Sequence, residues 1–122
     1  MKNILIASLS ILALTSVLQA TQDMEEFVNK KCGICHLAGK LTKEKLRNFS
    51  APPMWGVTKK IKINFPSKQD GIAFMMDFTM NPSKEKMLFP QETIDRFGLM
   101  PSQKGNLTDK ELQDIVEYIL SK

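Results

Sequence analysis

The chain has 122 residues, of which 43% are hydrophobic and 25% charged, and its formal net charge at pH 7 is +4. This length accommodates one domain with one hydrophobic core and leaves no room for a second. The modest positive charge and the lack of aromatic residues interleaved with the lysines argue against nucleic-acid binding.

Residues 1–20 have the pattern of an export signal. Lys2 stands in a short basic start, residues 4–18 form an apolar run, and Ala20 closes a candidate cleavage site. The run is shorter than the roughly 20 apolar residues of a membrane span, although an uncleaved anchor is the alternative. We therefore expect a signal peptide over 1–20 and a mature domain over 21–122, exported to the periplasm without stable membrane insertion.

A first helix is predicted directly after this leader. Asp23 with Glu26 three residues later is an N-terminal capping signal. The helix is expected to carry Val28, Cys32 and Cys35 along one side.

Both cysteines and the only histidine of the chain lie in the stretch Cys32-Gly33-Ile34-Cys35-His36. This is the spacing for covalent haem attachment. Two thiols three positions apart can each add across a haem vinyl group, and the adjacent imidazole then lies under the iron as its ligand. The motif predicts one haem c, attached through Cys32 and Cys35, with His36 on the iron.

Other readings of the two cysteines are weaker. A thioredoxin-like dithiol site needs a strand before the motif and a βαβ core around it, and neither is evident. Structural zinc needs four ligands, whereas the chain offers two cysteines and one histidine before it turns to carboxylates. A structural disulfide would leave the position of His36 as a coincidence.

The middle of the chain alternates short helices with proline-containing loops. Residues 40–50 are expected to form a short helix or a loop, and Ala51-Pro52-Pro53 then prevents regular structure at one edge of the cofactor. Ser67 with Asp70 opens a second helix that ends at Asn81-Pro82, with one face made of Ile72, Ala73, Met76 and Thr79. The only stretch with strand-like alternation is 60–65.

Two further helices are predicted near the C-terminus. Pro90 begins a short one over 91–97, and Gly98 stands where a left-handed cap is needed. Thr108 and Glu111 form a capping box for the last helix, whose apolar residues recur at helical spacing: Leu112, Ile115, Val116, Ile119 and Leu120. The fold class is therefore all-α.

The second axial ligand of the iron decides the function. A thioether makes the iron six-coordinate and suits electron transfer, whereas an open site suits gas binding or catalysis. Of the eight methionines, Met100 fits best, because it lies between two helices, after Gly98 and before Pro101. Met75, Met76 and Met80 are expected to fill the core. Met54, in the proline-rich loop, is the competing ligand.

The chain resembles the class I cytochromes c over essentially the whole mature segment. Three markers carry the resemblance: the CxxCH motif at 32–36, Ala51-Pro52-Pro53-Met54-Trp55-Gly56, which is similar to the family's GPxLxG loop, and Gly98-Leu99-Met100-Pro101 before the final helix. The resemblance implies a cytochrome c fold of three to five helices wrapped around one covalently attached haem, in which the first and last helices cross. Phe27 or Val28 would then contact Tyr118.

The same resemblance implies roles for single residues. The carbonyl of Pro52 would accept a hydrogen bond from the His36 ring. Met54 would pack against the macrocycle, Trp55 could donate a hydrogen bond to a propionate, and Met100 would be the distal ligand. Trp55 as a packed loop aromatic is the simpler alternative. Ala51 departs from the family's usual glycine, and the methionine-rich stretch between Gly56 and Gly98 is longer than in the smallest members.

The predicted function is one-electron exchange between respiratory redox proteins by a monomer that is not an enzyme. The alternative is a haem sensor, or a haem subunit of a redox enzyme, with a displaceable Met100. Basic residues gather around the motif and acidic residues in the last helix, so the basic face could steer an acidic donor or acceptor, although a merely solvated face is the alternative. The basic set is Lys30, Lys31, Lys40, Lys43, Lys45, Arg47, Lys59, Lys60 and Lys62.

Overall fold

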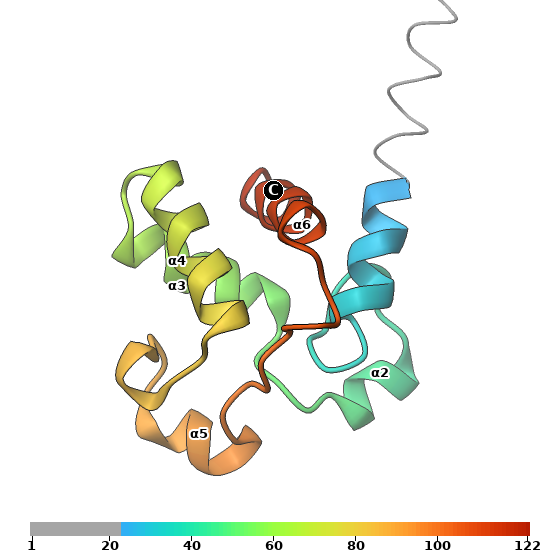
Figure 1. Ribbon diagram of the computed structural model, residues 1–122. Helices are drawn as coiled ribbons and strands as arrows, with labels where there is room; N and C mark the ends of the chain where they lie inside the picture. Colours follow the sequence, from blue (N-terminus) through green and yellow to red (C-terminus); the bar gives the residue numbers. More distant parts are fainter. Residues whose placement is uncertain (1–22) are drawn as a thin grey trace, which may run out of the picture.

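A computed structural model describes residues 23–122, which fold as helices joined by loops (Figure 1). The predicted signal peptide, 1–20, lies outside the described residues. A first helix over 23–32 is followed by α2 (Lys43–Asn48), α3 (Met54–Asn64), α4 (Lys68–Met80), the short 3₁₀ helix η1 (Lys84–Lys86), α5 (Gln91–Phe97) and α6 (Asp109–Leu120).

The predicted all-α class is confirmed. Within 23–122 the only extended pairing is an isolated bridge between Lys104 and Leu107. The first helix together with α2 to α6 exceeds the expected three to five helices, because α3 was not predicted. No helix across the described range is both long enough and apolar enough to cross a membrane.

The hydrophobic core lies where α6 packs against α4, with α3 and the first helix beside them. In Figure 1, α6 is seen end-on while the first helix runs upright next to it, so the two cross at a large angle. Val28 belongs to the core, and Phe27 and Tyr118 pack against it. The buried apolar side chains are Val28, Leu37, Ala38, Ile61, Ile72, Met75, Leu107, Leu112, Ile115, Val116, Ile119 and Leu120.

The predicted capping signals of α4 and α6 are confirmed. At α6, the Thr108 hydroxyl accepts from the Glu111 backbone N–H (3.1 Å), and the Glu111 carboxylate accepts from the Thr108 N–H (2.9 Å). At α4, the Ser67 hydroxyl accepts from the Asp70 N–H. These bonds satisfy backbone donors that a helix start leaves without partners, so both helices begin at the residues that the sequence indicates.

The strand-like stretch 60–65 is a helix, which corrects the sequence reading. The carbonyl of Pro53 accepts from the backbone N–H groups of Gly56 and Val57, so α3 starts directly after the two prolines. Its β-branched residues have low helix propensity, but packing overrides propensity here. Ile61 is buried and lies close to Gly71 of α4. A Cβ added to this glycine would be 2.9 Å from the Ile61 Cγ2.

The face of α4 that the sequence analysis identifies is only partly buried. Ile72 is buried, Met76 and Thr79 are half-buried and Ala73 is exposed. Gly71 and Met75 are the other buried residues of this helix.

The C-terminal end of α4 anchors two later segments. Lys86 pairs with Asp77 (Nζ to Oδ2, 2.7 Å) and donates to the Asn81 carbonyl, which ties η1 to α4. The Ser102 hydroxyl donates to the carbonyl of Met80 (2.6 Å). The hydrogen bond from Lys86 first, and that from Asn81 second, lower the pKa of Asp77 below its ordinary value.

Ile115, at 1% exposure, is expected to be the most costly single truncation in α6. Ile115→Ala should lower the free energy of unfolding by about 2–5 kcal/mol, because it removes buried methyl groups and leaves a cavity. Urea denaturation followed by circular dichroism measures this loss. Gln113→Ala, at an exposed position of the same helix, should change stability by less than about 0.5 kcal/mol. Equal losses in both variants would contradict the described core.

The Asp77 and Lys86 pair predicts a pH dependence. Because the folded pKa of Asp77 is lowered, its contribution is present above the unfolded pKa of about 3.9 and is lost as the pH falls through the folded pKa. The free energy of unfolding should therefore fall less steeply between about pH 5 and pH 2 in Asp77→Asn than in the unmodified protein. Urea titrations at several pH values test this, and identical slopes would show that the pair has no role in stability.

Candidate functional site

The CxxCH motif forms the turn that ends the first helix. The helix stops at Cys32, the Gly33 N–H donates to the Asn29 carbonyl and the His36 N–H donates to the Cys32 carbonyl, both at 2.9 Å. Cys35 therefore lies in the turn rather than on the helix as predicted, because Gly33 favours leaving the helix at this point. Cys32 is half-buried, Cys35 is exposed, and both thiols are free.

Burial governs the protonation of the motif. It raises the pKa of the Cys32 thiol to about 11, with a smaller contribution from the charge on Cys35. Burial also lowers the pKa of His36, against the opposing effect of a hydrogen bond to Pro52. At neutral pH, Cys32 is a protonated thiol and His36 a neutral imidazole.

The His36 ring is held in one orientation. Its Nδ1–H donates to the Pro52 carbonyl oxygen at 2.6 Å, which leaves the Nε2 lone pair free. A neutral imidazole with one nitrogen bonded to a carbonyl and the other free is the usual form of a metal-ligating histidine. The geometry therefore suits an iron ligand at Nε2.

Two backbone hydrogen bonds hold the motif turn against the proline-rich loop. The Ser50 N–H donates to the Cys35 carbonyl and the Met54 N–H to the Leu37 carbonyl, each at 3.1 Å. This pairing brings Pro52 under the His36 ring and leaves Met54 half-buried at the start of α3. Trp55, the next residue, is 56% exposed and lies in the first turn of α3.

Two segments, 39–60 and 76–106, carry apolar side chains but have no buried core of their own. No residue is fully buried over 39–60 or over 76–106 within the described chain. The rings of Phe49 and Phe97 contact each other with centroids 5.8 Å apart, and Lys60 lies over the Phe89 ring. The half-buried apolar residues include Met54, Val57, Met80, Leu88, Ile94, Leu99 and Met100.

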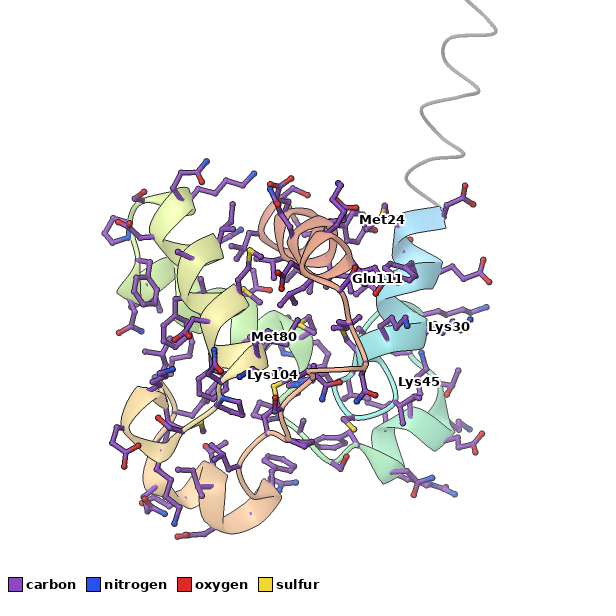
Figure 2. All side chains as sticks on the ribbon, in the orientation of Figure 1. Met24, Lys30, Lys45, Met80, Lys104 and Glu111 are labelled. Atoms are coloured by element: carbon purple, nitrogen blue, oxygen red, sulfur yellow. The ribbon has the colours of Figure 1, made fainter. Side chains whose placement is uncertain are left out.

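Met100 lies in the segment between α5 and α6, which contacts two other parts of this region. Phe97 at its start contacts Phe49, and Ser102 at its end is bonded to Met80 of α4. Residues 98–103 are neither helix nor strand, and Gly98 has a positive φ of 77° at the end of α5. This extended chain runs from α5 towards α6 in Figure 1, and Figure 2 shows Met80 and Lys104 beside it. Met100 is half-buried in its middle.

These residues fit a covalently attached haem. Two free thiols lie on one turn, the Nε2 of a neutral imidazole has no hydrogen-bond partner among residues 23–122, and the apolar side chains of 39–60 and 76–106 are at most half-covered by protein. A flat macrocycle would cover that lining and remove its apolar surface from water. A cluster of three or more His, Cys, Asp or Glu side chains able to hold a metal ion is not found among residues 23–122.

The basic residues near the motif divide into two groups. Lys45 and Lys60 are half-buried and engaged with protein, Lys60 over an aromatic ring and Lys45 in hydrogen bonds. The others are exposed, and Figure 2 shows Lys30 pointing away from the first helix. The sequence prediction includes Lys45 among the surface cations and does not identify its partner Asn29. The spacing of residues along the chain does not reveal which lysine side chain turns inwards.

Comparisons with known proteins show which family the chain is similar to. Residues 19–119 match the model of the family described as cytochrome c oxidase, cbb3-type, subunit III. An uncharacterized protein of Aquifex aeolicus (strain VF5) is 27% identical over 106 residues, which cover 77% of this chain and 69% of the relative. No solved structure matches the chain significantly.

The two thiols give a direct test of covalent attachment. We expect the purified, denatured protein to have the mass of the polypeptide plus one haem, with neither Cys32 nor Cys35 available to an alkylating reagent, because thioether bonds consume both thiols. Mass spectrometry of the peptide that contains residues 32–36 measures both properties. Alkylation of both cysteines, or the mass of a disulfide without haem, would contradict the attachment.

Proposed function

The chain belongs to the class I c-type cytochromes, and from this premise we propose that it is an exported, single-haem carrier of electrons between respiratory redox proteins. The observation that carries the proposal is the His36 ring, fixed by the Pro52 carbonyl at 2.6 Å with Nε2 free. Covalently bound haem and one-electron transfer follow from the family. The ligand residues, the respiratory role and the export are our inferences.

Each residue of the proposed site has a defined task. Cys32 and Cys35 would hold the haem through thioether bonds, and His36 and Met100 would ligate its iron. When bound, the haem supplies an iron that accepts and returns a single electron. The Pro52 carbonyl increases the basicity of His36 and fixes its orientation. The Met100 thioether favours the reduced state and closes the position that a small ligand would need.

The surroundings of the site support transfer rather than turnover. Half-buried apolar side chains from Phe49 to Val57 and from Met80 to Met100 exclude water from the proposed haem face. Exposed lysines around the motif favour association with acidic redox partners, at a rate that falls with ionic strength. We propose that this basic face is where donor and acceptor dock.

Export is proposed from the pattern of residues 1–20. A short basic start and an apolar run precede the mature domain, and covalent haem attachment in proteins with this motif takes place outside the bacterial cytoplasmic membrane. The periplasm is therefore the proposed compartment.

A second candidate function is that of a haem subunit in a redox enzyme. The matching family is described as a subunit of an oxidase, which is the observation in favour of this alternative. A displaceable Met100 would distinguish it, because an iron that loses its thioether can bind a small ligand.

Met100→Ala is expected to abolish the sulfur-to-iron charge-transfer band of the oxidised protein. The reduction potential should fall by an amount on the order of 0.1 V, within the range of roughly 0.8 V that axial ligands control. Absorption spectroscopy and a redox titration measure these changes. The matched control is Met54→Leu, which should retain the band because Met54 is proposed to pack against the haem rather than to ligate it.

Carbon monoxide separates the two candidate functions. The unmodified reduced protein should not bind it if Met100 stays on the iron, whereas Met100→Ala should. Ready binding by the unmodified protein would favour the sensor or enzyme-subunit alternative. Loss of the charge-transfer band in Met54→Leu instead would show that the ligand assignment is wrong.

A further inference from the structure

Lys45 of α2 makes hydrogen bonds to two other parts of the chain. Its Nζ donates to the Asn29 Oδ1 at 2.6 Å, to the Ala38 carbonyl at 3.2 Å and to the Lys40 carbonyl at 3.1 Å. Asn29 belongs to the first helix, and Ala38 and Lys40 to the loop that follows the CxxCH motif. Figure 2 places Lys45 between α2 and this loop.

The three protons of the Lys45 ammonium are matched by three oxygen acceptors. An ammonium has three donors and no acceptor, so all of its hydrogen-bonding capacity is used. The side chain is half-buried, unlike the exposed Lys43 of the same helix. Lys45 is therefore part of the internal structure and not of the surface that would meet a partner.

Asn29 is the second component of this arrangement. Its backbone carbonyl accepts from Gly33, and its side chain binds Lys45. A Cβ added to Gly39 would lie 3.3 Å from the Asn29 Cβ, so the loop folds closely over this side chain. Gly39 has a positive φ of 65°, which lets the chain reverse there. The loop over 33–40 is thus wrapped around Asn29 and closed by Lys45.

His36 lies between this closure and the proline-rich loop. On one side, the motif is bonded to Ser50, Pro52 and Met54. On the other side, Ala38, two residues beyond His36, is held by Lys45. Only Leu37 separates His36 from Ala38, so the contact of Lys45 with the chain lies close to the imidazole.

We propose that Lys45, together with Asn29, is a positioning residue that fixes the His36 ring on the Pro52 carbonyl and so sets the reduction potential. This inference rests on the proposed function, in which His36 ligates the haem. Without the ammonium, the Ala38 and Lys40 carbonyls lose a donor and the loop gains freedom at the residues next to His36. The hydrogen bond at Nδ1 becomes weaker, and the basicity of the ligand changes with it.

The test compares variants of the haem-loaded protein. Lys45→Met retains the length of the side chain and removes the three donors, whereas Lys43→Met removes an equal charge from the exposed face of the same helix. Asn29→Asp retains an oxygen acceptor for Lys45, and Asn29→Ala removes it. Two properties are measured in each variant: solvent exchange of the His36 Nδ1 proton by NMR in the reduced state, and the midpoint potential.

We expect Nδ1 exchange to be about tenfold faster in Lys45→Met, because the bond to Pro52 opens more often, together with a measurable shift in potential. Lys43→Met should match the unmodified protein in both measurements, and Asn29→Asp should match it in Nδ1 exchange. If Lys45→Met does not accumulate with haem, Asn29→Ala decides, with faster exchange than Asn29→Asp expected. A general loss of stability would also speed exchange of the buried backbone amides of α6, whereas the proposed effect is confined to His36.

Several outcomes overturn the inference. Unchanged exchange and potential in Lys45→Met, or in Asn29→Ala where that variant decides, would show that the closure does not position His36. Equal shifts in Lys43→Met would show that surface charge sets the potential. A haem-loaded, unmodified protein in which the His36 ring is not an iron ligand would overturn the proposed function itself, and the inference with it.

Discussion

The hydrogen bond from the His36 ring to the Pro52 carbonyl is the contact on which the rest of the site depends. It requires the turn after the first helix and the loop before α3 to lie side by side, and the backbone bonds from Ser50 and Met54 keep them so. It also selects the tautomer, because a carbonyl accepts only from a protonated Nδ1. The orientation of the His36 ring and the path of the chain around it are therefore fixed together.

The rest of the molecule divides into a part with a buried core and a part without one. The first helix, the end of α3, α4 and α6 share a buried core, whereas residues 76–106 contain no fully buried side chain. The segments around Met100 are consequently held by a few contacts, such as those of Ser102 with Met80 and of Phe97 with Phe49. A group that binds only the folded state stabilises it, and covering the apolar lining would extend the core into this half.

The sequence predicts those elements whose signals are local. The capping residues Ser67 and Thr108 determine where α4 and α6 begin, and the spacing of apolar residues identifies the buried face of α6. The helix over 54–64 was not predictable in this way, because its β-branched residues disfavour a helix and the close approach of Ile61 to Gly71 is a tertiary contact. The motif and its histidine follow from residue types, but the inward turn of Lys45 depends on Asn29 sixteen residues away.

The lysines around the motif show that net charge is a poor measure of a docking surface. Lys45 contributes to the same positive total as Lys43, yet its protons are bound to Asn29 and to loop carbonyls. Only the exposed cations can raise the rate of association with an acidic partner, since a partner cannot compete with three internal acceptors. Under the proposed function, recognition of a partner and the orientation of His36 would therefore depend on different lysines of one basic cluster. Substitution of an exposed lysine would change the association rate and leave the contacts of Lys45 in place.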